Sequence, residues 1–185
     1  MPDQRESSEA QLLVQRALQE HESALIGYTT GILNGDAERA RDVVQDAFLK
    51  LWVADHAKVR DNVKAWLYTV CRNRALDVMR KEQRLEFGNE TALLHTPASE
   101  PEPGHQADMQ DLSERVWDLV ESLTPNQREV LKLKFQHDCS YQQIAEITGL
   151  SVGNVGFILH TSLKKLRHQL QKQLSRKPPS HAHHP

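Results

Sequence analysis

The sequence predicts an all-α protein built from two small helical domains and a flexible acidic linker. Apolar residues recur at spacings of three and four in both halves, whereas almost no segment shows the period of two that a half-buried strand requires. Residues 86–114 contain seven acidic side chains, three prolines and no Lys or Arg. Such a stretch neither propagates a helix nor buries a core. We therefore expect domains over residues 8–86 and 112–174, a linker over 87–111 and a disordered tail over 175–185.

Composition restricts the class of protein. The chain has 185 residues, of which 26% are charged and 38% hydrophobic, and its formal net charge is −2. This length suits one or two small domains and excludes a large catalytic fold such as a TIM barrel. No apolar run approaches the roughly 20 residues of a membrane helix, and the polar N-terminus lacks a secretory signal, so we expect a cytoplasmic protein. Cys71 and Cys139 have no metal-ligand spacing, and the tail histidines fit a solvated segment, so we expect no metal and no cofactor.

The first domain is expected to contain three helices. Residues 8–33 form the first, which ends at Asn34-Gly35, a pair suited to left-handed backbone. Asp36 then caps a second helix, whose expected inward face is Ala37, Ala40, Val43, Val44, Ala47, Phe48, Leu51 and Trp52. The opposite face carries Asp42, Gln45, Asp46, Leu49 and Lys50. A leucine among exposed charges suggests a protein-binding surface, although an isolated acidic stripe is usually only solvated.

A polar connection over residues 55–61 precedes the third helix, which Asn62 caps and which runs to about Arg84. The expected inward residues are Val63, Leu67, Val70, Cys71, Ala75 and Val78. The outward face combines the aromatic residues Trp66 and Tyr68 with Arg72, Arg74, Arg80, Lys81 and Arg84. Aromatic rings stack on unpaired bases while guanidinium groups hold the phosphate backbone, so this face suits a partly melted DNA strand. The alternative is that the aromatic rings anchor the core beside a solvated basic face.

The second domain is expected to end in a helix-turn-helix. One helix covers residues 112–123, and Thr124-Pro125 opens the next. Ser140 and Gln143 form a capping box, Gly149 makes a tight turn, and Ser151 caps a last helix that reaches about Leu174. The small core between these two helices would contain Ile144, Leu150, Val152 and Val155. A plain helical hairpin is the alternative, but the basic residues Lys164, Lys165 and Arg167 favour DNA phosphates as the partner.

Four of these segments, in this order, resemble a bacterial sigma factor of the extracytoplasmic-function class. They are residues 42–52 (DVVQDAFLKLW), 65–80 (AWLYTVCRNRALDVMR), 123–131 (LTPNQREVL) and the helix-turn-helix that begins at Ser140. The resemblance covers most of residues 12–170 and implies sigma region 2 in the first domain and sigma region 4 in the second. The protein would then be a transcription initiation factor that binds core RNA polymerase and directs it to promoters, with no catalytic activity of its own.

The resemblance also implies partners. The helix over residues 36–53 would dock on the clamp helices of the largest RNA polymerase subunit, through Asp42, Gln45, Asp46 and Leu49. The acidic linker would thread the polymerase channels, and the second domain would sit on the flap of the second-largest subunit. Most members of the class are held by an anti-sigma factor, so such a partner is implied as well.

At the minus-ten promoter element, residues 56–62 would hold a base flipped out of the non-template strand, and the third helix would contact the melted DNA. Flipping a base costs a few kcal/mol, which stacking and phosphate contacts must offset. The residues implied at this element are His56, Lys58, Arg60, Asn62, Trp66, Tyr68, Arg72, Asn73, Asp77, Arg80 and Lys81.

At the minus-thirty-five element, the residues implied are Ser140, Ser151, Gly153, Asn154, Gly156, Phe157, His160, Lys164 and Lys165. Here the chain departs from the family, whose members usually carry Lys, Ser and Arg along this helix. No Arg is placed for a bidentate contact to guanine, whereas Asn154 and His160 remain as polar candidates and Phe157 could meet a thymine methyl group. We expect a weaker or shape-based reading of this element, or alternatively a protein interface at Phe157 and Ile158.

Two other functions are compatible with parts of the sequence. A DNA-binding regulator that acts without polymerase would use only the helix-turn-helix, and the first domain argues against it. A sigma-like adaptor that binds polymerase or an anti-sigma factor without reading promoters is supported by the glycines of the last helix. An enzyme is disfavoured, because the sequence shows no carboxylate pair, activated nucleophile, phosphate loop or metal cluster.

Overall fold

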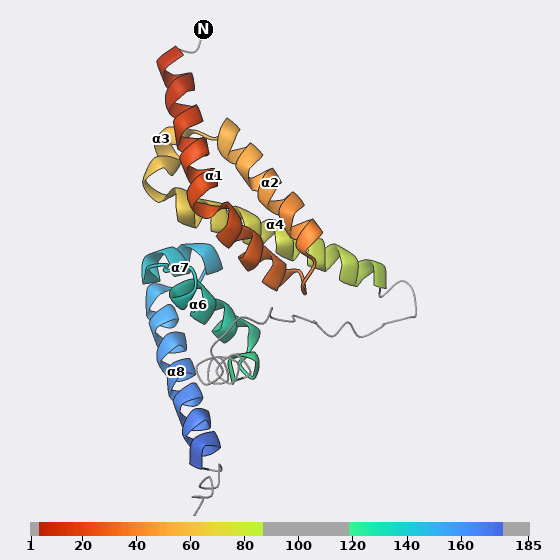
Figure 1. The fold of residues 1–185 in the computed structure, drawn as a ribbon, viewed down its shortest axis with the longest axis vertical. Helices are drawn as coiled ribbons and strands as arrows, with labels where there is room; N and C mark the ends of the chain where they lie inside the picture. The colour runs from red at the N-terminus through yellow and green to blue at the C-terminus, as the bar shows by residue number, and fades with distance from the viewer. Residues whose placement is uncertain (1–3, 87–118, 176–185) are drawn as a thin grey trace, which may run out of the picture. The chain divides into compact units, whose positions relative to one another are not determined.

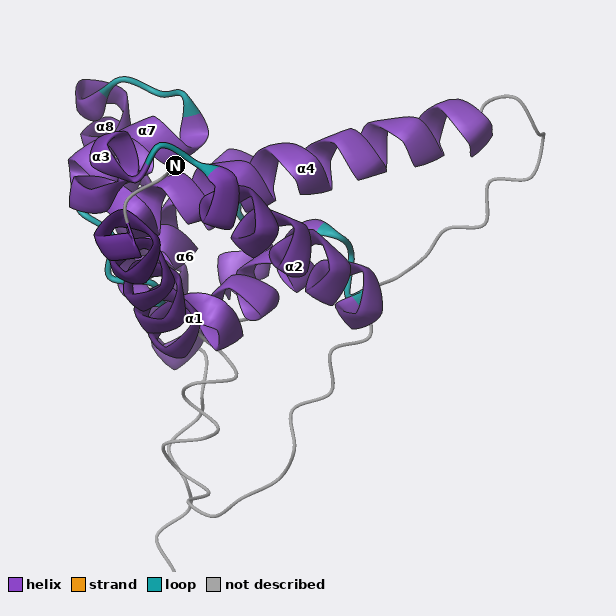
Figure 2. Ribbon diagram, turned by 90° about the horizontal axis from the view of Figure 1, so that it is seen from above, coloured by secondary structure: helices purple, strands orange, loops and turns teal. Residues whose placement is uncertain are grey.

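The computed structural model of the chain describes residues 4–86 and 119–175, and every regular element in those two ranges is helical (Figures 1 and 2). This confirms the predicted all-α class. The elements are α1 (Gln4–Ile32), α2 (Ala37–Val53), α3 (His56–Val59), the 3-10 turn η1 (Arg60–Asn62), α4 (Val63–Glu86), α6 (Pro125–Phe135), α7 (Tyr141–Thr148) and α8 (Val152–Ser175).

The helices form two compact units, the first containing α1 to α4 and the second α6, α8 and most of α7. The predicted linker over residues 87–111 lies outside the described residues, as does nearly all of the predicted tail. Of the helix predicted over residues 112–123, only the end from Leu119 is described, and it is helical to Glu121.

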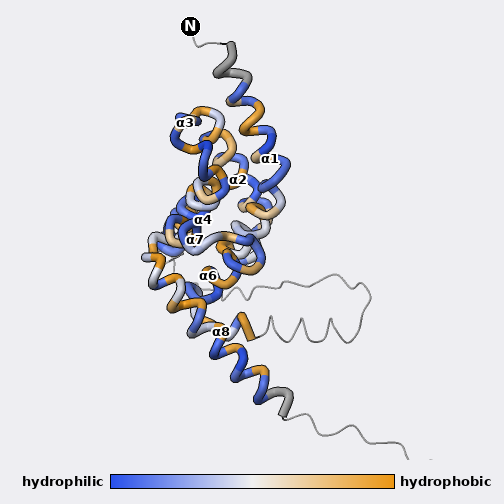
Figure 3. The backbone as a smooth tube through the Cα atoms, turned by 90° about the vertical axis from the view of Figure 1, so that its left-hand side faces the viewer, coloured by the Kyte–Doolittle hydropathy of each residue, from blue (hydrophilic) through white to orange (hydrophobic). Residues whose placement is uncertain are grey.

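In the first unit, α1, α2 and α4 pack against one another in pairs. Their apolar stripes meet in a core whose largest fully buried side chains include Leu25, Leu51, Leu67 and Tyr68. Apolar and polar positions alternate along α1 and α8 in Figure 3, as amphipathic helices require. Arg39 of α2 pairs with Glu82 of α4, which ties the two helices together at the surface.

The turn between α1 and α2 has the predicted chemistry. Asn34 and Gly35 adopt left-handed backbone, with φ of 54° and 94°. The Asp36 side chain accepts a hydrogen bond from the backbone N–H of Arg39 at 2.9 Å, which satisfies one of the free donors at the start of α2. Three consecutive residues therefore end α1, make the turn and begin α2.

Two predictions about α2 and the segment that follows it are wrong. Trp52 was expected to face the core, but it is 49% exposed, because it lies about 100° further round α2 than the fully buried Leu51. Residues 55–61 were expected to be a polar connection, but they form α3 and most of η1. Asp55 caps this short helix by accepting from the N–H of Ala57 at 3.2 Å, and Asn62 ends the 3-10 turn that leads into α4.

In the second unit, α6, α7 and α8 surround Val130, Leu133, Ile144 and Val155, all fully buried. Thr124 and Ser140 each form a capping box, with Gln127 and Gln143 respectively, so both predicted helix starts are confirmed. Arg128 pairs with Glu121 and donates to the carbonyls of Glu121 and Leu123, which closes the turn before α6.

The helix-turn-helix consists of α7, a turn at Gly149 and α8. Gly149 has a φ of 74°, and the hydroxyl of Ser151 accepts from the N–H of Asn154 at 3.2 Å, as predicted. Val152 does not fill the core between the helices, since it is the first residue of α8 and is 46% exposed. Phe135, the last residue of α6, is 63% exposed.

Candidate nucleic-acid and protein interfaces

The first candidate interface is the outward face of α2. Asp42, Gln45, Asp46 and Leu49 are all exposed, at spacings that place them opposite the buried stripe. Trp52 and Val53 continue the same face by one turn, with 49% and 79% exposure. We call these six residues the α2 surface. It is acidic at one end and apolar at the other, a combination that suits a protein partner more than DNA.

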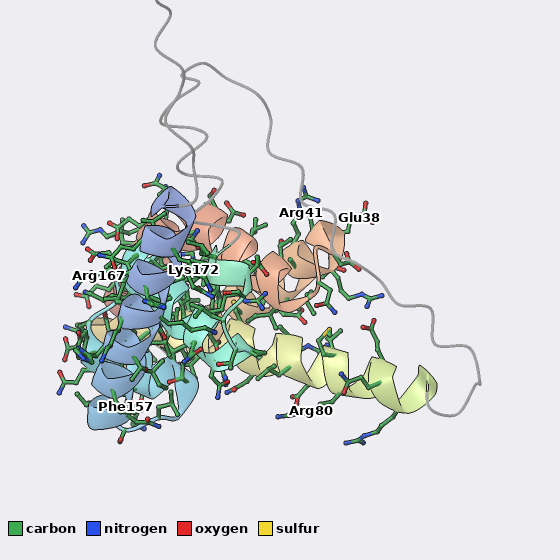
Figure 4. The ribbon with its side chains drawn as sticks, turned by 90° about the horizontal axis from the view of Figure 1, so that it is seen from below. Glu38, Arg41, Arg80, Phe157, Arg167 and Lys172 are labelled. Carbon is green, nitrogen blue, oxygen red and sulfur yellow. The ribbon has the colours of Figure 1, made fainter. Side chains whose placement is uncertain are left out.

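Sequence reasoning missed Trp52 and Val53 as members of the α2 surface. Their spacing of three and four from Leu49 is the signal that could have placed them there. Asp46 is also engaged within the unit, because its Oδ2 lies 3.7 Å from Nε of Arg74 on α4. Figure 4 shows Glu38 and Arg41 extending outward from the first turns of α2, so charged side chains also border this surface.

The second candidate interface begins at α3 and η1. The predicted residues His56 and Arg60 line a pocket of about 530 Å³ together with Leu12, Leu13 and Arg16 of α1. Nε2 of His56 donates to the carbonyl of Leu51 at 2.9 Å, which holds the short helix against the end of α2. The contribution of α1 was not expected from the sequence, and the 63% exposure of Leu12 is its structural sign.

Charged side chains surround this pocket with both signs. Glu9 and Asp55 contribute carboxylates, and Arg16 and Arg60 contribute guanidinium groups. Nζ of Lys58 lies 3.0 Å from Oδ2 of Asp55, and this hydrogen bond, with the Lys58 charge, lowers the pKa of the Asp55 carboxyl. The predicted DNA-binding residue Lys58 therefore already has a carboxylate partner on its own helix.

The third part of the first unit's candidate interface is the outward face of α4. Asn73, Asp77, Arg80 and Lys81 are exposed, and Arg72 and Trp66 are half-buried. Nη1 of Arg80 lies 3.0 Å from Oδ1 of Asp77. Figure 4 shows Arg80 projecting from the C-terminal half of α4, away from α2. These side chains form a mixed but mainly basic face.

Tyr68 does not belong to this face, contrary to the prediction. It is 1% exposed, and its ring lies 5.0 Å from that of Tyr28 with a 53° tilt between the ring planes. The reason is helical position, because residue 68 shares the buried stripe of α4 with Leu67, Cys71 and Ala75. Of the two predicted stacking residues, only Trp66 has surface available to a base.

The candidate interface of the second unit is α8 and its approach from α7. Gly153, Asn154, His160, Lys164 and Lys165 are exposed. Phe157 is 67% exposed, and Figure 4 shows it near the start of α8, with Arg167 and Lys172 further along the helix. Gly156 is half-buried, because the ring of Tyr141 would lie 3.6 Å from a β-carbon placed there.

Several residues predicted to bind DNA form hydrogen bonds within the second unit. The hydroxyls of Ser140 and Ser151 accept hydrogen bonds from backbone N–H groups in the first turns of α7 and α8. Nζ of Lys165 donates to the carbonyl of Ser122 at 3.2 Å. Of the predicted set, Asn154, Phe157, His160 and Lys164 form the exposed face of α8 that a DNA groove or a protein could cover.

In the part of the chain that the structure describes, neither the two cysteines nor any group of metal-ligating side chains forms a chemical site. Cys71 and Cys139 are both buried and neither is in a disulfide, and burial raises the pKa of the Cys71 thiol to about 12. Within residues 4–86 and 119–175, no three His, Cys, Asp or Glu side chains are placed to share a metal ion. No helix of the same residues has the length and apolarity to cross a membrane.

Comparison with known proteins matches both parts of the chain to sigma factors. The family profile for Sigma-70 region 2 matches residues 17–85, and the profile for Sigma-70, region 4 matches residues 113–166. The chain is 31% identical over 135 residues to the ECF RNA polymerase sigma factor EcfG of Rhodopseudomonas palustris, covering 72% of each chain. It is 29% identical over 167 residues to the ECF RNA polymerase sigma factor SigL of Mycobacterium tuberculosis, covering 88% of this chain and 92% of SigL.

A solved structure agrees with these sequence matches. It is the sigma factor RpoE of Bartonella quintana in complex with the anti-sigma factor NepR. The alignment has a TM-score of 0.62 and 25% identity, and it covers 85% of this chain and 96% of the RpoE chain.

Proposed function

Because the chain belongs to the extracytoplasmic-function sigma factors of the sigma-70 family, and so directs RNA polymerase to promoters, we propose how its surfaces divide that task. The first unit binds the core enzyme through the α2 surface and holds the melted minus-ten element on α3, η1 and α4. The second unit places α8 at the minus-thirty-five element. The observation that carries this proposal is the chemical contrast within one unit, where an acidic and apolar face on α2 accompanies a mainly basic face on α4.

The α2 surface is the docking site for the clamp helices of the largest polymerase subunit. Its carboxylates, Asp42 and Asp46, are exposed and would be matched by basic side chains on the partner. Leu49 and Trp52 supply apolar area beside them, 61% and 49% exposed. Exposed apolar side chains beside charged ones are a usual composition of a specific protein interface.

The pocket beside α3 receives the flipped base of the minus-ten element. A volume of about 530 Å³ accommodates a nucleobase, and Arg16 and Arg60 at its wall can hold the adjoining phosphates. Trp66 offers a half-exposed ring, and Arg80 and Lys81 offer charge to the strand that leaves the pocket. Lys58 and Arg80 must first leave their carboxylate partners, at the small cost of an exposed ion pair.

The second unit sits on the flap of the second-largest subunit and presents α8 to the major groove. This geometry is the ordinary one for a helix-turn-helix, in which the N-terminal residues of the second helix meet base edges. Lys164, Lys165 and Arg167 lie further along α8, where they can position the helix on phosphates. These contacts set orientation but do not read sequence.

An anti-sigma factor is the further partner that we propose. The support is the RpoE structure, in which NepR is bound to a chain that aligns with 85% of this one. The exposed apolar residues Leu49, Trp52 and Val53 would remain in water when polymerase is absent, and an inhibitor that covered them would also block docking. The adaptor function remains the competing proposal, and transcription assays distinguish the two.

Charge reversal on the α2 surface tests the docking proposal. Asp46→Lys should weaken binding of the full chain to core RNA polymerase by about tenfold or more, since it opposes like charges at the interface. Fluorescence anisotropy of the labelled chain, titrated with core enzyme, gives the Kd. Asp42→Lys repeats the test without breaking the 3.7 Å contact of Asp46 with Arg74.

Glu22→Lys, an equal charge change at an exposed position of α1, is the control and should leave the Kd unchanged. If both α2 variants bound core enzyme as tightly as the wild type, the clamp assignment would be withdrawn.

A further inference from the structure

One narrow stripe of α8 faces directly away from the core of the second unit. Val155, Leu159 and Ser162 are at most 2% exposed and define the buried side of the helix. Gly153, Phe157, His160 and Lys164 follow at spacings of three and four on the opposite side, and all four are exposed. We call these four residues the α8 stripe. Asn154 is exposed on its flank, one turn before Phe157.

The base-facing end of the α8 stripe has no charge. From Ile147 to Leu163 the chain contains no Asp, Glu, Lys or Arg, and the first cation is Lys164, two turns after Phe157. Arg and Lys are the side chains that read guanine through O6 and N7. The turns that enter a major groove therefore lack the usual guanine-reading groups.

Two hydroxyl groups, one at the start of α8 and one further along it, are already hydrogen-bonded within the helix, so they are not available to read base pairs. The hydroxyl of Thr161 lies 2.9 Å from the carbonyl of Phe157 and 3.1 Å from that of Ile158, so its proton is used within the helix. Ser151 caps α8. Asn154 and Phe157 are exposed in the first two turns of α8 and can discriminate between base pairs, whereas His160 lies in the third turn.

From this arrangement we infer that α8 reads A·T base pairs at the minus-thirty-five element, with Asn154 on adenine and Phe157 on the thymine methyl group. An amide side chain makes two hydrogen bonds to N6 and N7 of adenine, and an apolar side chain contacts the C5-methyl of thymine. The inference rests on the proposed function of the second unit and adds its base specificity. Neither residue makes a contact that requires guanine.

Gly153 and the basic end of α8 favour DNA over a protein as the occupant of the stripe. A β-carbon at Gly153 would have no atom within 4 Å in the free protein, so the glycine is not required by packing inside the unit. Because glycine has no side chain, the helix backbone at this position, one turn before Phe157, can approach base edges closely. Lys164 continues the same stripe, and Lys165 and Arg167 flank it, which suits the phosphates beside a groove.

The first experiment selects DNA with the complete holoenzyme. Core RNA polymerase is combined with the full chain and used to enrich duplexes from a library that is randomised across both promoter elements. We expect an upstream motif of A·T pairs without a required G·C pair. In synthetic copies of the enriched duplex, each upstream thymine is then replaced by uracil, which removes only the C5-methyl group.

The wild-type holoenzyme should lose affinity by about fourfold at one or two thymines, the equivalent of one buried methyl group. Phe157→Ala should abolish this sensitivity to uracil, and Asn154→Ala should lose roughly tenfold discrimination at one adenine. Phe135→Ala is the matched control, because Phe135 is 63% exposed on α6 of the same unit. It should keep the full uracil effect. Phe157 is 67% exposed, so its truncation removes no core packing.

Three results would overturn the inference. One is an upstream motif with a required guanine that His160→Ala or Lys164→Ala relaxes, and another is a uracil effect that persists in Phe157→Ala. The third is enrichment of the downstream element alone, with Phe157→Ala weakening capture of a protein partner instead. In all three the sigma function stands. If the chain confers no selection on core polymerase at all, the proposed function fails and the inference fails with it.

Discussion

Arg80 and Lys81 are the residues from which the strongest effect on promoter opening is expected. Both are exposed on α4, and Arg80 is held 3.0 Å from Asp77 in the free protein. Replacing both with Ala should reduce open-complex formation by the holoenzyme and flatten its dependence on salt. Each phosphate contact to a single strand contributes a slope of about 0.7 in log K against log salt concentration. Permanganate reactivity of unpaired thymines, measured across a salt series, gives both quantities.

Arg41→Ala is the control for this prediction, because it removes an exposed cation that Figure 4 shows pointing outward from α2. It should leave the salt slope of opening as in the wild type. A double variant that opened promoters normally at all salt concentrations would remove α4 from the DNA interface.

Cys71 predicts how stability depends on alkaline pH. Burial raises its pKa from 9.0 to about 12, so the folded chain retains a proton that the unfolded chain releases near pH 9. The stabilisation is complete below pH 9 and is lost as the pH rises from 9 through 12, by at most about 4 kcal/mol. Urea unfolding at pH 8 and pH 10.5 should show a larger loss for the wild type than for Cys71→Ala. Equal losses in the two proteins would contradict the raised pKa.

Single residues are also where sequence reasoning was weakest. Tyr68 and Trp52 are both aromatic residues at the edge of a helical stripe, and the periodicity assigned each to the wrong side. A spacing of three or four fixes a face only to within one residue position, about 100° of rotation. The ring of Tyr28, which covers Tyr68, comes from α1, and its approach is not encoded in the periodicity of α4.

At the scale of an element, α8 contains a testable conflict between helix propensity and function. Gly156 lies in the helix interior, where Ala is favoured over Gly by roughly 0.5–1 kcal/mol. A β-carbon there would be 3.6 Å from the ring of Tyr141, which is ordinary van der Waals contact. Gly156→Ala should therefore raise the free energy of unfolding of the second unit.

Gly149→Ala is the matched comparison, since its φ of 74° is left-handed and strains any residue with a β-carbon. It should lower stability by about 1–2 kcal/mol. Thermal unfolding followed by circular dichroism measures both variants. A shift of the two Tm values in the same direction would contradict the assignment of helical backbone to Gly156 and left-handed backbone to Gly149.

Elements whose boundaries depend on neighbouring residues were predicted well. The turn at Asn34-Gly35, the capping box of Ser140 with Gln143 and the cap at Ser151 all follow from local hydrogen bonding, so the sequence suffices to place them. The short helix α3 was missed because its four residues are too few to show an apolar period, although its contacts are also local. Its four residues are held by the contact of His56 with Leu51 and by the cap at Asp55.

The same difference explains which parts of the interfaces were foreseen. The outward face of α2 was predicted because every member sits on one helix, and the four residues proposed to face polymerase are all exposed. The pocket beside α3 was not, because five of its nine lining residues come from α1, about 40 to 50 positions earlier in the chain. Contacts between distant elements depend on packing that a single sequence pattern does not reveal.

At the scale of the whole molecule, each of the two matched sigma-70 regions corresponds to one of the two compact units. Sigma-70 region 2 matches residues 17–85 and region 4 matches residues 113–166, with the acidic, proline-rich stretch between them. This arrangement suits the proposed function, in which each unit contacts one promoter element. The domain limits at residues 8, 86, 112 and 174 stay predictions, since the segment between the matched regions lies outside the described residues.

The most direct test of the central claim is transcription from fragmented genomic DNA by purified core RNA polymerase, with and without the full chain, followed by mapping of the transcript start sites. The account predicts new starts that depend on the chain and share two upstream motifs at a fixed spacing, one for each unit. Binding to core polymerase without any new start would contradict promoter recognition and favour an adaptor. No binding to core polymerase would contradict the docking assignment as well.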